Sequence, residues 1–453
     1  MTQRQVKFAT DAKTIVLGLG VTGLSCVRHL AAQGANLAVA DTRANPPGLV
    51  ELQQDYPDIP VFLGSFDAAL LASADRLVVS PGIAAATPEI AAAAQQGAQV
   101  MGDIELFAQA VAAPVAAITG SNGKSTVTTL LGEMAQAAGV HVAVGGNLGR
   151  PALDLLDASV ELYVLELSSF QLETTQSLSA AVATVLNISP DHMDRYASIE
   201  DYAAAKARIF QQTGVGVVNV DDPLVAPMRG ADDRWSFTLG EAIDEKMFGV
   251  ATIDGCDYLC RGEQPLLSAD ELLIPGSHNR ANALAALAMG TALGFPLTPM
   301  LEVLRRFRGL PHRTEFVTEH AGVRWYNDSK GTNVGATIAA LQGLDLGDDT
   351  RTVLIAGGDC KGADFTPLGE VLKSRVRAVV LIGRDADQIA DVLPQAMPSR
   401  MARTLDEAVD HAAALACPGD RVVLSPACAS FDMFDSYVQR GDRFMRAVRS
   451  RLA

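Results

Sequence analysis

A short glycine-bearing turn constrains this 453-residue chain more than any other stretch, since it joins an apolar run to a helical pattern; it reads Gly120, Ser121, Asn122, Gly123, Lys124, Ser125, Thr126. Strand, glycine turn, Lys-Ser and helix form a phosphate-binding loop, because the N–H groups of the helix start point at the phosphate. Lys124 is expected to reach a nucleotide's terminal phosphates, and Ser125 to hold Mg²⁺. Ile118 stands where the general pattern has its first glycine, so the loop is shortened. The alternative is an ordinary turn with an incidental lysine.

A second glycine turn lies near the N-terminus. A strand pattern leads into G-x-G-x-x-G, and the next strand pattern, 37–40, ends at Asp41; the turn is Gly18, Leu19, Gly20, Val21, Thr22, Gly23. An acid about 20 residues after such a turn is typical of a dinucleotide site. Three interpretations remain open: an NAD site, a tight turn that binds nothing, and a Rossmann-like half that holds another nucleotide by its diphosphate.

Acidic side chains follow two apolar runs in the middle of the chain. Glu166 ends the first run, at the point where a Mg²⁺ ligand lies beside a phosphate loop. A carboxylate that satisfies a helix start is the alternative. After the run 183–186, Asp191, His192 and Asp194 occur within four residues. This density favours a metal or substrate role over a solvent-exposed histidine.

The last third of the chain alternates strand and helix patterns, with a final helix over 437–451 whose arginine-rich face is expected to be solvated. Three polar turns follow strands, where ligands bind at the carboxyl edge of an α/β sheet; they are 327–332, 357–362 and 425–432. The stretch 235–268 is predicted to be irregular, with short β-like runs.

Composition excludes several classes of protein. The net charge of −16 argues against non-specific binding to nucleic acid or anionic lipid. No apolar run reaches the length of a membrane span, and the polar stretch 1–13 has no signal-peptide core. Six scattered cysteines without zinc spacing indicate reduced thiols. We therefore expect a cytoplasmic chain with no nucleic-acid partner and no membrane insertion.

The chain resembles the Mur ligases, which build the peptide stem of peptidoglycan. The shortened phosphate loop is similar to the ATP loop of that family, and further motifs extend the resemblance over essentially the whole chain: Asp-Thr-Arg at 41–43, Ser-Pro-Gly-Ile at 80–83, Asp-His-Met-Asp-Arg at 191–195, His-Asn-x-x-Asn at 278–282 and Ser-Pro-Ala-Cys-Ala-Ser at 425–430. The resemblance implies an α/β fold of three domains. These are a Rossmann-like domain over 1–101, a central P-loop ATPase-like domain with a mostly parallel sheet over 102–307, and a Rossmann-like domain over 308–453.

The same resemblance implies roles for individual residues. ATP is expected to contact the loop Gly120 to Thr126 together with Asn279, Arg313 and Asp328. A UDP-sugar is expected at Gly18, Leu19, Gly20, Thr22, Gly23, Asp41, Thr42, Arg43, Gly82, Asn147 and His192. D-Glutamate is expected at Thr332, Lys361, Ser430 and Phe431, and Mg²⁺ at Ser125, Glu166, His192 and Lys206, the last as a carbamate whose oxygens replace the cation. The residues expected at the reacting centre are Lys124, His192, Lys206, Lys330 and Lys361.

The implied activity is ATP-dependent addition of D-glutamate to UDP-N-acetylmuramoyl-L-alanine through an acyl phosphate, with two Mg²⁺ ions and a monomeric enzyme. Four alternatives remain. A sister ligase would add another amino acid, although the L-alanine-adding member usually has His where Asn122 stands. An NAD-dependent oxidoreductase leaves the phosphate loop unexplained, and a nucleotide switch lacks the guanine-reading Asn-Lys-x-Asp motif. A folate-polyglutamate-type ligase lacks the N-terminal glycine-turn domain.

Overall fold

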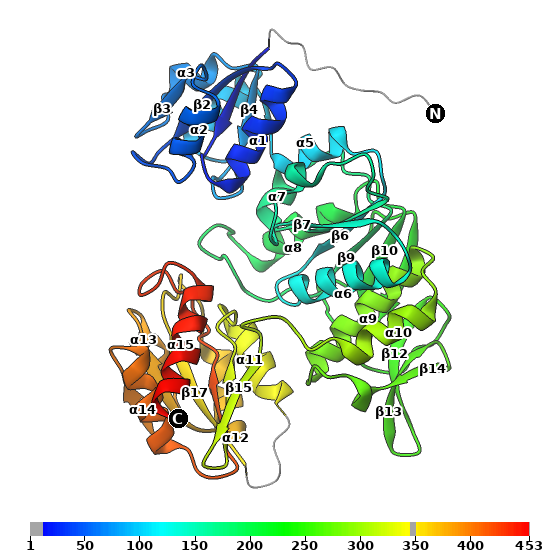
Figure 1. The fold of residues 1–453 in the computed structure, drawn as a ribbon, viewed down its shortest axis with the longest axis vertical. Helices are drawn as coiled ribbons and strands as arrows, with labels where there is room; N and C mark the ends of the chain where they lie inside the picture. Colours follow the sequence, from blue (N-terminus) through cyan, green and yellow to red (C-terminus); the bar gives the residue numbers. More distant parts are fainter. Residues whose placement is uncertain (1–11, 345–349, 453) are drawn as a thin grey trace.

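Three β-sheets follow one another along the chain in the computed structural model, which describes residues 12–344 and 350–452. Residues 1–11, part of the polar N-terminal stretch, lie outside the described ranges. We call the three parts the N-terminal, central and C-terminal units, each built around one sheet (Figure 1). No helix within the described ranges combines the length and apolar character that a membrane crossing requires.

The N-terminal unit contains five parallel strands in the order β3-β2-β1-β4-β5. Its elements are β1 (Lys13–Leu17), α1 (Val21–Ala32), β2 (Asn36–Asp41), α2 (Leu49–Asp55), β3 (Val61–Leu63), α3 (Ala68–Ala72), β4 (Arg76–Val79), α4 (Pro88–Gln95) and β5 (Gln99–Met101). A Cβ at Gly23 would lie 1.8 Å from the carbonyl oxygen of Gly18, so only glycine lets α1 start this close to β1.

The central unit contains nine strands in the order β14-β13-β12-β11-β10-β9-β6-β8-β7. Its elements begin with α5 (Asp103–Ala110), β6 (Val115–Thr119), α6 (Lys124–Ala137), β7 (Val142–Gly146), η1 (Ala152–Leu155), β8 (Leu162–Glu166), α7 (Ser169–Glu173) and β9 (Val182–Val185). They continue with α8 (Ile199–Ala207), η2 (Arg208–Phe210), β10 (Val215–Asn219), β11 (Asp233–Phe237), β12 (Met247–Ile253), β13 (Cys256–Arg261), β14 (Gln264–Ser268), η3 (Ala269–Glu271), α9 (Ser277–Ala292) and α10 (Leu297–Arg306). Helices α6, α9 and α10 share one buried cluster, and α5, α7 and α8 share the other, because successive β6 side chains alternate between the two faces.

The stretch 235–268 contains the predicted short β-like runs, but these are paired strands of the central sheet, and apart from two tight turns only 238–246 lacks regular structure, which corrects the prediction of an irregular stretch. Strands β11 and β12 extend the parallel sheet, and β13 and β14 add two antiparallel strands. Between β12 and β13, Asp254 and Gly255 form a two-residue turn, both with positive φ (50° and 81°). Asp-Gly is a strong hairpin signal because such turns need two residues that tolerate this conformation. The sequence therefore carried a hairpin signal that the prediction missed.

The C-terminal unit contains six strands in the order β15-β16-β20-β17-β18-β19, of which β15 and β16 pair antiparallel and the others parallel. Its elements are β15 (Glu315–His320), β16 (Val323–Asn327), α11 (Val334–Gly343), β17 (Thr352–Gly357), α12 (Thr366–Arg375), β18 (Val376–Ile382), α13 (Ala386–Ala390), β19 (Ser399–Met401), α14 (Leu405–Leu415), β20 (Arg421–Leu424) and α15 (Tyr437–Arg451).

Helix α15 has the predicted bounds, but one of its arginines is not solvated. Arg440 is 1% exposed and shares the buried face of the helix with Phe444 and Val448. Arg443 and Arg451, by contrast, form partly exposed ion pairs with Asp406 of α14. The prediction that the arginine-rich face of this helix is solvated is therefore wrong for Arg440.

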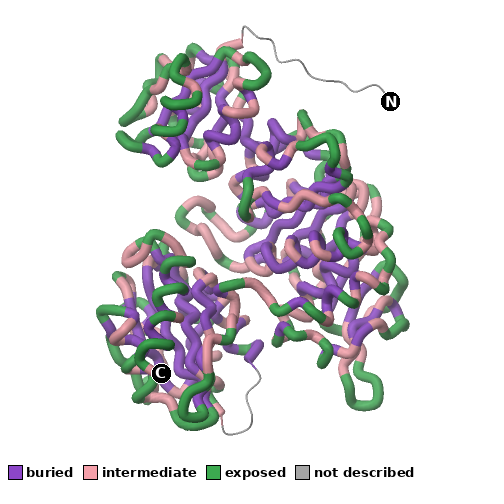
Figure 2. Tube along the Cα trace, in the orientation of Figure 1, coloured by how far each residue is buried: buried purple, intermediate pink, exposed green. Residues whose placement is uncertain are grey.

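We call the contact between the N-terminal and central units the N-terminal joint, and the contact between the central and C-terminal units the C-terminal joint. The two joints differ in whether the buried residues on either side belong to one cluster (Figure 2). One cluster includes side chains of both the N-terminal and the central unit, among them Leu30 of α1, Phe107 of α5 and Tyr163 of β8. The C-terminal unit has two clusters, one on each face of its sheet, formed by its own residues. The first joint is thus part of a hydrophobic core, whereas the second is not.

Candidate active site

The predicted phosphate loop connects β6 to α6. Gly120 and Gly123 have φ of +150° and +84°, and a Cβ at Gly123 would lie 2.3 Å from Asn282 Oδ1. Helix α6 begins at Lys124, so the N–H groups of its first turn face the loop. Lys124 Nζ donates hydrogen bonds to the carbonyl oxygens of Gly120 (2.8 Å) and Ser121 (2.9 Å). Its cation therefore lies over the loop that is predicted to hold the phosphates.

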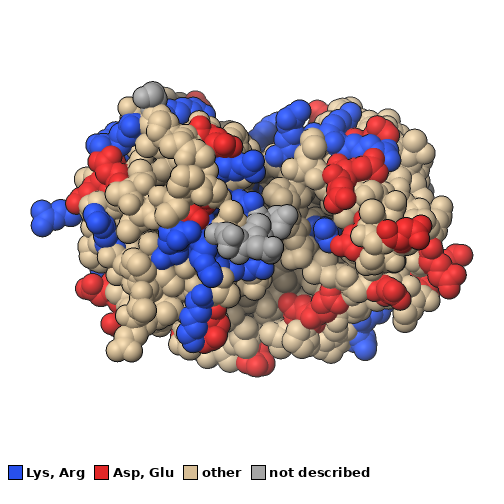
Figure 3. Space-filling model, turned by 90° about the horizontal axis from the view of Figure 1, so that it is seen from below, with Lys and Arg blue, Asp and Glu red and all other residues tan. Residues whose placement is uncertain are grey.

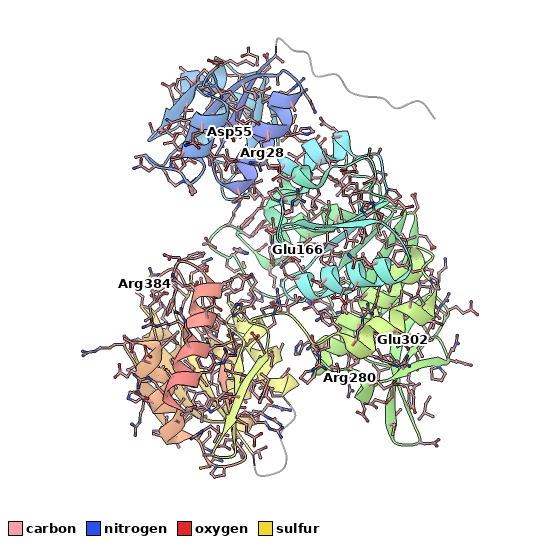
Figure 4. The ribbon with its side chains drawn as sticks, in the orientation of Figure 1. Arg28, Asp55, Glu166, Arg280, Glu302 and Arg384 are labelled. Atoms are coloured by element: carbon pink, nitrogen blue, oxygen red, sulfur yellow. The ribbon has the colours of Figure 1, made fainter. Side chains whose placement is uncertain are left out.

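Ser125 and Glu166 meet directly beside this loop, and Glu166 is labelled in the central unit in Figure 4. Ser125 Oγ donates to Glu166 Oε2 (2.6 Å), Asn147 Nδ2 donates to Glu166 Oε1 (2.8 Å), and Arg313 Nη2 donates to Ser125 Oγ (2.8 Å). Burial raises the pKa of Glu166, but the charge of Lys124 and these hydrogen bonds outweigh it and hold the pKa below its ordinary value. The carboxylate is therefore ionised, and with the Ser125 hydroxyl it offers the hard oxygen ligands that suit Mg²⁺.

Lys206 of α8 is buried against the underside of the loop, with 1% of its surface exposed. Its Nζ donates to the carbonyl oxygen of Gly120 (3.0 Å) and lies 4.5 Å from the centre of the Tyr202 ring. Burial, and secondly the charge of Lys124, lower the pKa of Lys206 well below its ordinary value. A neutral amine is the form that reacts with CO₂, so this environment suits carbamate formation.

The segment after β9 brings Asp191 and His192 toward the same region. His192 has a left-handed backbone (φ 57°), its Nε2 lies 3.8 Å from Asp191 Oδ2, and its ring packs edge-on against Phe170. Burial lowers the pKa of His192, which favours the neutral imidazole that can act as a metal ligand. Among the described residues, no three Cys, His, Asp or Glu side chains are grouped to hold a metal ion.

A cavity of about 300 Å³ lies between the central and C-terminal units. It brings together residues that the sequence predicted to contact ATP and one, Lys330, that it predicted at the reacting centre; the ATP residues are Asn122, Gly123, Thr126, Asn279, Arg313 and Asp328. Burial raises the pKa of Asp328 to about 6, despite hydrogen bonds from Ser425 and Thr314. His278 also lines this cavity, and its ring packs against two glycines that face each other: a Cβ at Gly276 would lie 2.8 Å from its Cε1, and a Cβ at Gly343 would lie 2.7 Å from it.

A second cavity, of about 290 Å³, is lined by side chains from the three polar turns of the C-terminal unit and by Asp191 and His192. The four residues predicted to bind D-glutamate line it together: Thr332, Lys361, Ser430 and Phe431. Lys330 lines both cavities. Burial and the charge of Arg313 lower the pKa of Lys330 to about 8. Figure 3 shows the hollow between the two lobes, with Lys and Arg side chains along it.

Hydrogen bonds cross between the central and C-terminal units at the phosphate loop. The side-chain amides of Asn122 and Asn333 exchange two hydrogen bonds (3.4 and 3.2 Å), and Asn333 Nδ2 also donates to Asp191 Oδ2 (3.1 Å). The sequence prediction included Asn122 but not Asn333. Its position as the N-cap of α11 disguised it, since capping alone explains an asparagine there.

The residues predicted to bind the UDP-sugar lie apart from both cavities, except for His192, which lines the second one. Asp41, at the end of β2, accepts hydrogen bonds from the Leu19 N–H (2.7 Å) and from the backbone and guanidinium of Arg43. Burial raises the pKa of Asp41, but these bonds lower it to about 2. Ser80 Oγ donates to the Gly18 carbonyl oxygen (3.1 Å) and so connects the turn after β4 to the turn after β1. Asn147 lies instead beside Glu166.

Two further residues at this site were not predicted. The ring of Tyr437 lies 4.0 Å from Lys330 Nζ and lines the second cavity. Arg440, one helical turn further along α15, lies buried beneath the turns that carry Lys330 and Ser430. A signal for Arg440 existed in the sequence: it precedes Phe444 by four residues and Val448 by eight, which is the spacing of a buried helix face.

The fold agrees with comparisons to known proteins. Three family models match: "Mur ligase MurD-like, N-terminal domain" over residues 12–102, "Mur ligase middle domain" over 118–290, and "Mur ligase, glutamate ligase domain" over 312–428. The chain belongs to the Mur ligase family.

Individual relatives are similar over nearly their whole length. Proteins named UDP-N-acetylmuramoylalanine--D-glutamate ligase are 54% identical in Marinobacter nauticus and 55% in Pseudomonas fluorescens, over 97% of this chain and 98% of each relative. Among solved structures, UDP-N-acetylmuramate-alanine ligase from Thermotoga maritima matches with a TM-score of 0.61 at 18% identity, over 97% of this chain and all of that one. MurF ligase from the same organism, in complex with ADP, matches at 0.60 and 15%, over 99% and 100%. These structures share the fold.

Proposed function

We propose that this protein is an ATP-dependent ligase that joins D-glutamate to UDP-N-acetylmuramoyl-L-alanine in the cytoplasmic synthesis of peptidoglycan precursors. The observation that carries the proposal is the pair of adjoining cavities with Lys330 in both. One cavity adjoins a phosphate loop, and the other presents Lys361 and Ser430 to a dicarboxylate. The named relatives, at about half identity over nearly full length, support the same activity. One chain lines both cavities, so a monomer suffices.

The arrangement suits the activation of a carboxylate. A carboxylate is a poor acyl donor, so its oxygen first attacks the γ-phosphorus of ATP. The bond from this phosphorus to the oxygen that bridges to the β-phosphate breaks, which releases ADP and gives an acyl phosphate. The amine of D-glutamate then attacks the acyl carbon, and phosphate leaves. Both steps bring anions together, and the protein contributes positioning and positive charge. Lys124, Lys330 and Lys361 are placed to supply that charge, and no side chain has to form a covalent bond.

Mg²⁺ fits the oxygen donors beside the loop. Ser125 and Glu166 would hold one ion, which would neutralise charge on the nucleotide phosphates. His192 and a carbamate on Lys206 would hold a second. Lys206→Ala is expected to lose most activity, and short carboxylic acids are expected to restore part of it by supplying the missing oxygens. Full activity of the unsupplemented Lys206→Ala variant would rule out the carbamate.

The decisive experiment measures phosphate release from ATP with UDP-N-acetylmuramoyl-L-alanine, offering D-glutamate, L-glutamate or meso-diaminopimelate in turn. Release with D-glutamate alone is the expected result. Release with a different amino acid would make the protein a sister ligase with the same mechanism. No release with any of them would refute the proposed ligase activity, and a change in NADH fluorescence on adding the protein would then favour an oxidoreductase.

A further inference from the structure

Arg440 is a buried guanidinium that no described carboxylate binds directly. It projects from the first turn of α15 with 1% of its surface exposed, and burial lowers its pKa only to about 10, so it stays charged at neutral pH. Its hydrogen-bond partners are carbonyl and hydroxyl oxygens within the C-terminal unit. A buried cation is expensive unless its donors are satisfied, and here each nitrogen has an acceptor.

Those acceptors belong to two different ligand turns. Nε donates to Ser329 Oγ (3.0 Å) and Nη2 to the Ser329 carbonyl oxygen (2.9 Å), both in the turn after β16. Nη1 donates to the carbonyl oxygens of Cys428 (3.1 Å) and Ala429 (3.3 Å), in the turn after β20. The next residue of the first turn is Lys330, and the next residue of the second is Ser430. One side chain thus fixes the backbone directly before two site residues.

The orientation of these carbonyls has a further effect. In a trans peptide the C=O and the following N–H point in opposite directions, and the described chain has no cis bonds. The Ala429 carbonyl faces Arg440, so the N–H of Ser430 faces away from it. Likewise the N–H of Lys330 faces away from Arg440 and donates to the His312 carbonyl oxygen (3.0 Å). Arg440 therefore acts with the hydrogen bonds between Asp359 and Ala429 (3.0 and 2.9 Å) to fix which way the backbone donors of both turns point.

We propose that Arg440 is a positioning residue that holds the nucleotide turn at Ser329–Lys330 and the amino-acid turn at Cys428–Ser430 in one fixed arrangement, so that its loss weakens the use of ATP and D-glutamate together. The inference rests on the proposed function. It concerns a residue that touches neither cavity, since Arg440 lines neither of them.

Steady-state kinetics of Arg440→Ala test this inference. We expect the KM values for ATP and D-glutamate each to rise roughly tenfold, the effect of losing a hydrogen bond to a charged group, while the KM for the UDP-sugar substrate stays unchanged. Millimolar guanidinium should lower both raised KM values by occupying the vacated space. The matched control is Arg443→Ala on the same helix, whose arginine is exposed and pairs with Asp406; its KM values should equal those of the wild type, with or without guanidinium.

A purely structural role predicts a different pattern. Loss of folded protein would lower the apparent kcat and leave all three KM values unchanged, and that result would overturn the inference, as would an equal rise in all three. If Arg440→Ala does not fold, Arg440→Lys decides, because one ammonium cannot reach both Ser329 and Cys428. The KM for ATP or for D-glutamate should then rise, and unchanged values would overturn the inference. Absence of D-glutamate-dependent phosphate release from the wild type would instead refute the proposed function.

Discussion

The central unit is joined to its two neighbours by different kinds of contact. At the N-terminal joint, Leu30 and Phe107 share a buried apolar cluster with residues of the central sheet. Arg28 of α1 adds an ion pair with Asp154 (2.6 Å), and it points toward the central unit in Figure 4. Arg195 also donates to the carbonyl oxygen of Pro81 (3.1 Å). Opening this joint would expose apolar surface to water.

The C-terminal joint is polar. The Asn122–Asn333 amide pair and the Arg313–Ser125 hydrogen bond cross it, and no ion pair among the described residues does so. Each such hydrogen bond contributes only about 1 kcal/mol, because water replaces it when the joint opens. The difference predicts that the N-terminal unit is fixed, whereas the C-terminal unit swings about the segment 307–313. Domain closure of this kind would complete the site around both cavities.

The largest expected effect comes from breaking the apolar joint. Phe107→Ala should lower the free energy of unfolding by about 3–5 kcal/mol, because it leaves a cavity in the cluster shared by two units. In calorimetry the N-terminal and central units should unfold in a single transition, and Phe107→Ala should lower the midpoint temperature of that transition. Phe444→Ala, in the core of the C-terminal unit, is the control and should move a separate transition. Separate melting of the N-terminal and central units after Phe107→Ala would contradict a shared core.

A smaller effect concerns the charge of Lys330 at the polar joint. Its pKa is lowered to about 8, so the ammonium is present below pH 8 and is lost as the pH rises above it. The value of kcat/KM for ATP should therefore fall roughly tenfold per unit above about pH 8, since this ratio reports the free enzyme. Lys330→Arg should abolish this fall in kcat/KM above pH 8, because the guanidinium stays charged. If kcat/KM of Lys330→Arg still falls above the same pH, the titration belongs to another group. The control is Lys373→Arg, which changes an exposed lysine.

Removal of the amide pair should loosen closure without unfolding the protein. Asn333→Ala loses the bonds to Asn122 and Asp191, and the KM for ATP should rise about fivefold, as expected for about 1 kcal/mol. Solution scattering should show wild-type protein becoming more compact with an ATP analogue and the UDP-sugar substrate, and the variant less so.

Asn333 also caps α11, so the control variant must lose a helix cap while keeping the hydrogen bonds between the central and C-terminal units. Thr404→Ala removes the cap of α14, and it should lower stability by about 1 kcal/mol while leaving the KM for ATP unchanged. Equal compaction of wild type and Asn333→Ala would show that the amide pair does not control closure.

The smallest effect is expected from the ion pair at the apolar joint. Arg28→Met should lower stability by at most about 1 kcal/mol, because the pair is partly exposed and screened by salt. Kinetic constants should stay at wild-type values. Arg324→Met, which removes an exposed pair with Glu319, is the control for a pair away from any joint. A large change in kcat for Arg28→Met would show that this joint also moves during turnover.

Much of this architecture was predictable because local patterns specify it. The phosphate loop, the strand that ends in Glu166 and the three C-terminal turns are each short signals read from neighbouring residues. The direct contact of Ser125 with Glu166 follows from adjacent parallel strands, β6 and β8, whose carboxyl ends share an edge. Residues that act across the chain escaped prediction. Asn333 and Arg440 look like a helix cap and a surface arginine until long-range packing places their partners beside them.

Gly276 of the central unit, Gly343 of the C-terminal unit and the imidazole of His278 meet where these two units touch beside the first cavity. A Cβ at Gly276 would lie 2.8 Å from the Cα of Gly343, and a Cβ at Gly343 would lie 2.7 Å from His278 Cε1, so neither position has room for a methyl group unless the ring or the facing backbone moves. Burial lowers the pKa of His278 to about 4, so the ring stays uncharged at neutral pH and can be enclosed without a counter-ion. A single methyl group at position 343 would act as a wedge. If the two units close during turnover, Gly343→Ala is therefore expected to stop the molecule after nucleotide binds and before the amide bond is made.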